Sequence, residues 1–220
     1  MSAPTADLSV YLVLDAAVCE IAGADPVHVV REAVAGGATT VQVRAKDLSS
    51  RAFTELAAAI AGVLPDRVPL VINDRADVAL ALRARGLRCD GVHVGQSDIP
   101  VEDLRMMLGD GAIIGLSAST PDQLAAAATS PARVDCVGIG PLHSTTSKAD
   151  APAGLGLDTV TDLARACPLP AVAIGGITPD DMAPLRRAGL AGGAVVSYIC
   201  AADDPRAATE RLASAWKEGA

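Results

Sequence analysis

The chain has 220 residues, of which 50% are hydrophobic and 20% are charged, and its formal net charge is -8. This composition excludes a disordered or fibrous protein, and a single domain accommodates the length. Because aromatic residues make up only 2% of the chain and its negative charge repels polyanions, we expect no nucleic-acid partner.

Nothing in the sequence predicts secretion or a membrane partner. A secretory signal places a basic residue before its apolar run, but the first basic residue here is Arg31, after the apolar residues 10–14. The chain contains no uninterrupted run of 18 apolar residues. Its five cysteines are scattered and form no CxxC pair, which indicates reduced thiols. We therefore expect a cytoplasmic protein, whose oligomeric state the sequence leaves open.

Short β-rich apolar runs alternate with helical segments along the whole chain. Several helical segments begin with proline after a capping residue, as at Asp25-Pro26, Thr178-Pro179 and Asp204-Pro205. Thr120 and Gln123 have the spacing of a capping box. The predicted strands are residues 10–15, 40–45, 70–73, 91–95, 113–117, 136–140, 171–175 and 194–198.

Eight strand-helix units of roughly 25 residues each are compatible with two α/β folds, a closed parallel barrel and a doubly wound open sheet. The number of units favours the barrel. No G-x-G-x-x-G sequence follows the first strand, which removes the main reason to expect a dinucleotide-binding sheet. We predict a single (β/α)8 TIM barrel over residues 1–220, with its active site at the carboxyl ends of the strands.

Polar side chains alternate with apolar ones where the second strand ends. Gln42, Arg44 and Lys46 are spaced two residues apart, so on an extended segment all three face the same side. Two cations that point into a barrel mouth are costly unless an anion neutralises them. The pattern predicts an anion site, although an arginine and a lysine can also extend from a strand end into solvent.

Two carboxylates follow neighbouring strands beside these cations. Asp74 ends the third strand after Asn73, and Asp98 follows the fourth. Mg²⁺ binds through one or two carboxylates plus substrate phosphates, so the pair predicts a magnesium site. Helix capping or loop salt bridges would also account for either aspartate. We interpret His93, between Gly91 and Gly95, as a hydrogen-bonded core residue.

A second anion site is predicted at the last two strands. Gly175 and Gly176 precede the capping sequence at Thr178, and Val196 and Ser197 lie on the eighth strand, where barrels often bind phosphate. The glycine pair alone is also typical of a tight turn. Residues 144–156 form a polar loop with the composition of a lid over an anionic ligand or of a bystander loop.

Taken together, these residues resemble the thiamine phosphate synthase (thiamine-phosphate pyrophosphorylase) family. The resemblance covers residues 12–199 and depends on an ordered series of short motifs. They are Gln42-Val43-Arg44-Ala45-Lys46, Asn73-Asp74-Arg75, residues 91–98, Gly115-Leu116-Ser117, Gly138-Ile139-Gly140-Pro141, residues 145–150, Ile174-Gly175-Gly176-Ile177 and Val195-Val196-Ser197.

The resemblance implies a transferase that condenses 4-amino-2-methyl-5-hydroxymethylpyrimidine diphosphate with 4-methyl-5-(2-phosphoethyl)thiazole to give thiamine phosphate and pyrophosphate. It implies Mg²⁺ on Asp74 and Asp98, and catalytic roles for Arg44, Lys46, Ser117 and Lys148. The implied pyrimidine diphosphate site comprises Gln42, Val43, Arg44, Ala45, Lys46, Asn73, Ser117 and Lys148, and the thiazole phosphate site Thr145, Thr146, Ser147, Gly176, Val196 and Ser197.

The implied mechanism is dissociative: pyrophosphate leaves first, and the thiazole nitrogen then attacks the pyrimidine cation. Such a reaction needs electrostatic stabilisation and no protein nucleophile. Three departures from the family pattern, His143, Ser144 and Ser147, bear on the rate and on the order of the strand-six loop. Two other functions stay open, a thiazole tautomerase-like relative and a non-catalytic phosphate-binding barrel.

Overall fold

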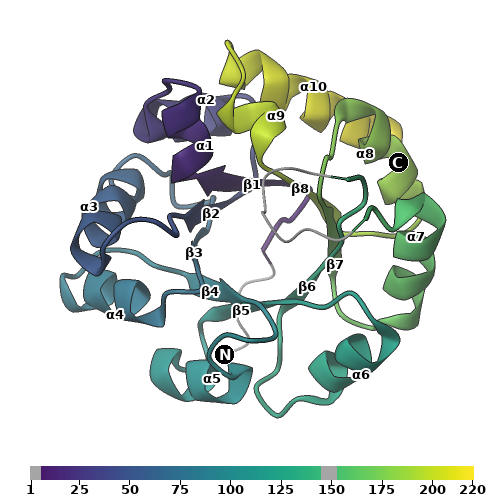
Figure 1. Ribbon diagram of the computed structural model, residues 1–220, viewed down its shortest axis with the longest axis horizontal. Coiled ribbons are helices and arrows are strands. Elements are labelled where there is room, and N and C mark those ends of the chain that lie inside the picture. Colours follow the sequence, from purple (N-terminus) through teal and green to yellow (C-terminus); the bar gives the residue numbers. More distant parts are fainter. Residues whose placement is uncertain (1–5, 145–152) are drawn as a thin grey trace.

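The computed structural model describes residues 6–144 and 153–220, and in these ranges it forms a closed barrel of eight parallel strands (Figure 1). The strands follow one another around the ring in sequence order, which confirms the predicted TIM barrel. They are β1 (Val10–Asp15), β2 (Thr40–Arg44), β3 (Leu70–Asn73), β4 (Gly91–Val94), β5 (Ile113–Ser117), β6 (Cys136–Ile139), β7 (Ala171–Ile174) and β8 (Gly192–Val195).

Helices surround the ring of strands and cover its outer face (Figure 1). Among the residues that the structure describes, two helices follow β1 and two follow β8, whereas each of the other strands is followed by one. The described residues form α1 (Ala16–Ile21), α2 (Pro26–Ala35), α3 (Ser50–Ala61), α4 (Ala76–Ala84), α5 (Val101–Leu108), α6 (Pro121–Thr129), α7 (Gly156–Ala166), α8 (Pro179–Arg187), α9 (Ser197–Cys200) and α10 (Pro205–Glu218). None of these is long and apolar enough to cross a bilayer.

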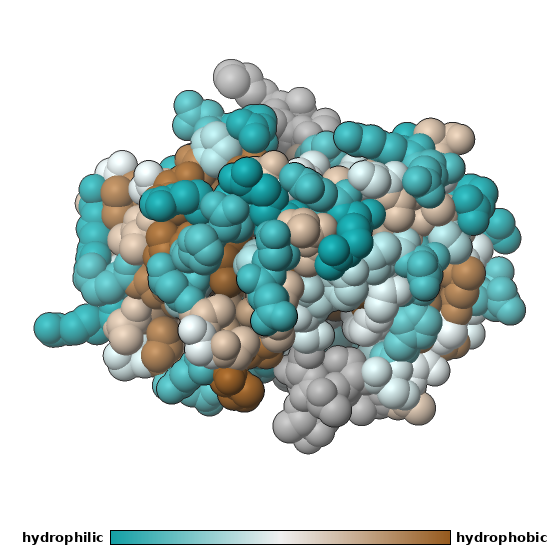
Figure 2. All heavy atoms as spheres, turned by 90° about the horizontal axis from the view of Figure 1, so that it is seen from above, coloured by the Kyte–Doolittle hydropathy of each residue, from teal (hydrophilic) through white to brown (hydrophobic). Residues whose placement is uncertain are grey.

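The core has two parts because successive strand residues face opposite sides of the barrel wall. The larger part lies between strands and helices and includes Val41 and Val43 of β2 and Phe53 of α3. The smaller part comprises Leu8, Tyr11, Val13, Cys136, Val172 and Ala194. Outside the core, the face shown in Figure 2 is mostly hydrophilic, with scattered hydrophobic groups.

The helix-start signals in the sequence are largely confirmed. Proline occupies the first turn of α2, α6, α8 and α10, and the carboxylates of Asp25 and Asp204 accept hydrogen bonds from backbone N–H groups of α2 and α10. The predicted capping box at Thr120 is only half present. The Gln123 side chain accepts a hydrogen bond from the Ser119 N–H, one residue before the cap.

The predicted limits of the eighth strand are wrong. The strand comprises Gly192–Val195 rather than residues 194–198, and Ser197 begins α9. Gly192 and Gly193 are strand residues that pair with β7 and, at Gly193, with β1. Position 192 requires glycine because the segment before β1 passes very close to it. A Cβ atom on Gly192 would lie 1.7 Å from the Leu8 carbonyl oxygen. β2, β4, β6 and β7 each end one residue earlier than predicted.

A buried arginine forms hydrogen bonds to both of the loops that lead into β5 and β6. Arg105 of α5 is 9% exposed, and its guanidinium donates to the carbonyl oxygens of Ala112 and Ala132, both at 2.7 Å, and to Asp135 at 2.9 Å. The Asp135 carboxylate also accepts from the Ile114 N–H at 2.8 Å. These contacts satisfy loop carbonyls that would otherwise be buried without a partner.

We expect Arg105→Met to lower the free energy of unfolding by about 3 kcal/mol, because it leaves several buried acceptors and the Asp135 charge unpaired. Urea denaturation measures the change. The matched control is Arg85→Ala, which removes an exposed ion pair with Glu55 and should cost less than about 1 kcal/mol. Equal effects of the two substitutions would show that the Arg105 network contributes no special stability.

Candidate active site

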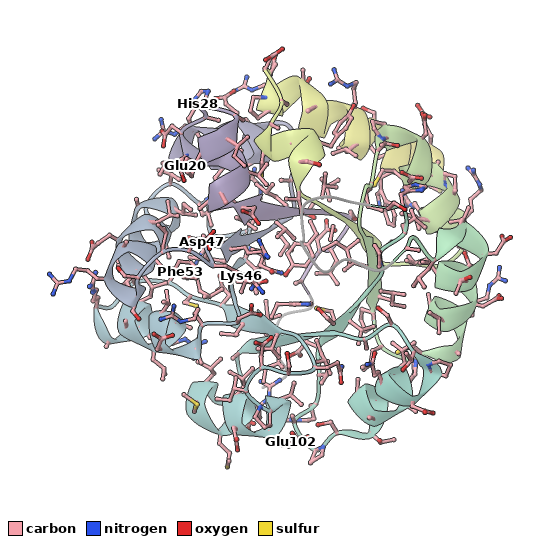
Figure 3. All side chains as sticks on the ribbon, viewed as in Figure 1. Glu20, His28, Lys46, Asp47, Phe53 and Glu102 are labelled. Atoms are coloured by element: carbon pink, nitrogen blue, oxygen red, sulfur yellow. The ribbon has the colours of Figure 1, made fainter. Side chains whose placement is uncertain are left out.

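A cavity of about 780 Å³ opens at the carboxyl ends of the strands. Its wall comes from every strand of the barrel and from the segments that follow them. It reaches from Lys46 and Ser97 at the mouth to Tyr11 and Val172 inside the barrel. In Figure 3, Lys46 lies on the inner side of the ring, whereas Glu20, His28 and Glu102 lie outside it. The cavity is therefore the place where the polar strand ends predicted from the sequence meet.

The barrel interior has room for the His93 side chain because two neighbouring strands present glycine to it. Gly115 of β5 and Gly138 of β6 both lie against the ring of His93, on the adjacent strand β4. A Cβ atom on Gly115 would lie 2.3 Å from His93 Nδ1, and one on Gly138 would lie 3.5 Å from His93 Cε1. The imidazole thus takes the space that side chains of β5 and β6 fill in a packed barrel.

Arg44 is already neutralised by a neighbouring strand. Its guanidinium forms an ion pair with Asp15, at the end of β1, and Asp15 also accepts a hydrogen bond from the Ala17 N–H at the start of α1. The prediction that the cations in the mouth need a bound anion to neutralise them is wrong for Arg44, because Asp15 already does so. Because its side chain is only partly buried and lines the cavity, Arg44 can still bind an anion there.

Lys46, Asp74 and Asp98 form a group of charges at the mouth. The Lys46 ammonium lies 3.7 Å from an Asp74 carboxylate oxygen, and Asp98 accepts a hydrogen bond from the Gly95 N–H at 2.7 Å. Burial, and after it the negative charge of Asp98, raises the pKa of Asp74. Asp74 has a φ of 61°, a left-handed conformation that aspartate tolerates better than most residues.

The aspartate pair fits a magnesium ion. The helix-capping alternative is wrong for both residues, because the residue that caps α4 is Arg75 and the one that caps α5 is Pro100. Two carboxylates that repel each other are stabilised by a divalent cation between them. Among residues 6–144 and 153–220 no cluster of three or more histidine, cysteine or acidic side chains could hold a metal. Magnesium suits such a sparse site because it keeps several waters and uses substrate phosphates as ligands.

A neutral hydrogen-bonding layer lies below these charges. Gln42 Nε2 donates to the Tyr11 hydroxyl at 2.9 Å, and His93 Nε2 lies 3.0 Å from Ser117 Oγ. Burial lowers the pKa of His93 to about 4, so its imidazole is neutral at pH 7. The prediction of a hydrogen-bonded core histidine is wrong in one respect: within the part of the chain that the structure describes, Nδ1 is buried without a partner. Asn73 also lines this part of the cavity.

The second predicted anion site lies on the β7 and β8 side of the same cavity. Gly175 and Gly176 have φ values of 98° and 68°, which favour glycine, and both line the cavity with Val196 and Ser197. His143 packs beside this turn: its N–H donates to the Gly175 carbonyl oxygen at 3.0 Å, and its Nε2 lies 2.8 Å from Asp181 of α8. The structure thus places this predicted site near the first.

Some predicted residues are not part of the described site. Thr145, Thr146, Ser147 and Lys148 lie outside the described residues. Val43 and Ala45 are buried in the core between strands and helices, because alternate residues of a strand face opposite sides, so their side chains do not line the cavity.

Sequence reasoning missed several residues that line the cavity. Tyr11 and Asp15 are spaced along β1 with the same two-residue period as Gln42 and Arg44 on β2, and this period could have identified them. No comparable signal marks Gln96, Ser119 and Gln123, which lie in loops or in a helix.

Comparison with known proteins agrees with this geometry. The family described as thiamine monophosphate synthase matches residues 10–199. The chain belongs to this family. It is 41% identical over 216 residues to the thiamine-phosphate synthase of Corynebacterium efficiens, with 98% of each chain covered. It is 44% identical over 214 residues to that of Natronomonas pharaonis, with 96% of each covered.

A solved structure supports the same assignment. The thiamine phosphate pyrophosphorylase from Pyrococcus furiosus superposes with a TM-score of 0.83 at 29% identity, covering 97% of this chain and 98% of that chain. The thiamine monophosphate synthase family thus accounts for both the sequence and the barrel, and the resemblance inferred from the motifs is confirmed.

The repulsion between the two aspartates should cost stability when no metal is present. A raised pKa means that the folded protein holds the Asp74 proton to a higher pH than the unfolded chain does, so stability falls as the pH rises above the ordinary aspartate range. We expect Asp74→Asn to raise the melting temperature of the metal-free protein at pH 7 by about 2 °C. Calorimetry in the presence of a chelator measures the shift.

Asp77→Asn is the control for this prediction. Asp77 is an exposed carboxylate whose pKa is lowered by its hydrogen bond to Arg75, so its removal should bring no gain in stability. Asparagine also tolerates the left-handed backbone at position 74. A lower melting temperature for Asp74→Asn would contradict the proposed repulsion.

Proposed function

We propose that this barrel condenses 4-amino-2-methyl-5-hydroxymethylpyrimidine diphosphate with 4-methyl-5-(2-phosphoethyl)thiazole, giving thiamine phosphate and pyrophosphate. Family membership and the curated relatives support thiamine-phosphate synthase activity, which makes the chain a transferase (thiamine-phosphate diphosphorylase). The observation that carries the proposal is the meeting of Lys46 with the Asp74–Asp98 pair at the mouth of a cavity large enough for two small substrates.

The reaction proceeds by loss of pyrophosphate before the new bond forms. The bond between the pyrimidine methylene carbon and the diphosphate oxygen breaks, and its electron pair leaves with pyrophosphate. The electron-rich pyrimidine carries the resulting cation until the lone pair of the thiazole nitrogen forms the carbon–nitrogen bond. No protein nucleophile takes part, so the protein contributes orientation and electrostatic stabilisation.

The cations of the mouth stabilise the departing pyrophosphate. Lys46 is half-exposed and only 3.7 Å from Asp74, so it can bind a diphosphate oxygen without leaving its partner. Arg44 is held by Asp15, which limits its rotamers before substrate arrives. Lys148, outside the described residues, takes part from the strand-six loop, while Gln42, Asn73 and Ser117 orient the pyrimidine diphosphate inside the barrel.

Asp74 and Asp98 would hold the magnesium ion. When bound, Mg²⁺ neutralises negative charge on the diphosphate oxygens and so makes pyrophosphate a better leaving group. The two aspartates suit this task because they lie next to the lysine that binds the same group. On the other side of the cavity, the turn at Gly176 and the segment at Val196 and Ser197 receive the thiazole phosphate, together with Thr145, Thr146 and Ser147.

The two alternatives from the sequence use less of this site. A thiazole tautomerase-like relative binds the thiazole phosphate alone and needs neither the lysine nor the aspartate pair. A non-catalytic phosphate-binding barrel has no use for a pair of carboxylates that destabilises it. For the same protein we infer a cytoplasmic location, because its five cysteines are free and buried. We also infer no nucleic-acid partner, because its net charge is -8.

Release of pyrophosphate distinguishes these functions. With Mg²⁺ and both substrates, we expect pyrophosphate and thiamine phosphate in equal amounts, whereas either substrate alone should give no turnover. Coupled phosphate detection and chromatography of the products provide the two readouts. Conversion of the thiazole phosphate alone would favour the tautomerase, and no turnover with both substrates would favour a binding protein.

Loss of one metal ligand should change the magnesium requirement. We expect Asp98→Asn to raise the Mg²⁺ concentration needed for half-maximal activity by at least about tenfold, because it removes a hard anionic ligand and keeps the shape of the side chain. The matched control is Asp47→Asn, an exposed aspartate that does not line the cavity. An unchanged magnesium titration for Asp98→Asn would exclude Asp98 as a ligand.

A further inference from the structure

His93 has a more specific environment than an ordinary core histidine. The side chain projects from β4 across the inner faces of β5 and β6 and is buried, yet the residue lines the cavity. One ring nitrogen, Nε2, lies 3.0 Å from Ser117 Oγ at the end of β5, and the other, Nδ1, has no hydrogen-bond partner among residues 6–144 and 153–220. The contact with Ser117 belongs to neither a helix cap nor an ion pair, so it is a specific interaction of the cavity wall.

The surroundings of Nδ1 decide which nitrogen carries the proton. A neutral imidazole has one N–H donor and one lone-pair acceptor. The position of a Cβ atom on Gly115 lies only 2.3 Å from Nδ1, so the glycine hydrogen in that direction points at this nitrogen. A proton on Nδ1 would crowd this glycine hydrogen, whereas a lone pair on Nδ1 can accept a weak C–H contact from it. This contact favours the tautomer that carries its proton on Nε2.

With its proton on Nε2, His93 donates a hydrogen bond to Ser117 Oγ. We propose that His93 is a positioning residue that orients the Ser117 hydroxyl, so that its hydrogen points into the cavity and donates to the pyrimidine diphosphate. This inference rests on the proposed function, which assigns Ser117 to that substrate. A hydroxyl that already accepts from a histidine donates to an anion without first breaking a competing contact.

Two further contacts support this role. The Ser117 carbonyl oxygen accepts a hydrogen bond from Gln96 Nε2 at 2.7 Å, so the backbone is held while the imidazole holds the side chain. The glycines at positions 115 and 138 leave space for the imidazole beside both strands, because a Cβ atom at either position would lie against the ring. A larger residue at position 115 would displace the ring and with it the donor to Ser117.

A double-mutant cycle tests the inference. The variants are His93→Leu, which removes the donor, His93→Gln, which can present an N–H at a similar position, Ser117→Ala, and His93→Leu combined with Ser117→Ala. We expect His93→Leu and Ser117→Ala each to lower kcat/KM for the pyrimidine diphosphate about five- to tenfold, the effect of losing one hydrogen bond. The double variant should be no worse than the more impaired single variant.

Two other readouts separate positioning from general damage. His93→Gln should retain more activity than His93→Leu, and the KM for the thiazole phosphate should change less than twofold in every variant. The control is His28→Leu, which removes an exposed histidine of α2. Thermal melts identify variants that fail to fold. If His93→Leu fails to fold, the cycle uses His93→Gln in its place, alone and combined with Ser117→Ala.

The outcomes are distinct. Effects of His93→Leu and Ser117→Ala that multiply in the double variant would overturn the inference, since the two residues would then act independently. Equal losses for both substrates would overturn it as well, in favour of a packing role. A parent-like Ser117→Ala would overturn it together with the assignment of Ser117 to the pyrimidine diphosphate. In that case the synthase activity itself would still be decided by the assay with both substrates.

Discussion

The pairing of β8 with β1 is the interaction on which the whole site depends. It joins Val10 to Gly193 and Leu12 to Val195 in parallel register and turns an open sheet into a closed barrel. Closure brings the carboxyl ends of all eight strands to one rim, so that Asp15 from the start of the chain and Ser197 near its end line the same cavity. Gly192 permits this closure because a side chain there would collide with the Leu8 carbonyl.

Glycines on the inner faces of two strands leave space inside the barrel for a polar side chain beside the cavity. TIM barrels usually fill their interior with branched side chains, but here the inner faces of β5 and β6 carry glycine, and a neutral histidine lies across them. The remaining interior is mixed: Tyr11 and Val172 supply apolar surface, and Gln42 and Ser117 supply hydrogen bonds. Such a layer suits a flat heterocycle, whereas the charges that suit phosphate stay at the mouth.

The charges at the mouth are arranged at a cost in stability. Burial, and after it the negative charge of Asp98, raises the pKa of Asp74 and makes its ionised form unfavourable. Elsewhere the protein pairs its buried charges closely, as in the network of Arg105 with Asp135. Lys46 only partly balances the two carboxylates, and such an arrangement is typical of a site that binds a cation.

Local patterns in the sequence were sufficient to determine the architecture and much of the site. The alternation of strands and helices, the proline-capped helix starts and the polar strand ends at Lys46, Asp74 and Asp98 are all properties of near neighbours in the chain. They were recognised because their periods follow directly from strand and helix geometry. The two-residue period of a strand also separates Gln42 and Arg44, which face the cavity, from Val43, which faces the helices.

Only the tertiary structure decided which side chains meet across the barrel. Arg44 and Asp15 are 29 residues apart in the chain, and His93 and Ser117 are 24 apart, and each pair depends on the register between adjacent strands. The limits of β8 likewise depend on its pairing with β7 and β1, and the need for glycine at position 192 depends on the close approach of the chain before β1. A single sequence carries no direct signal for register or close backbone approach, because both arise from contacts between segments that local propensity does not connect.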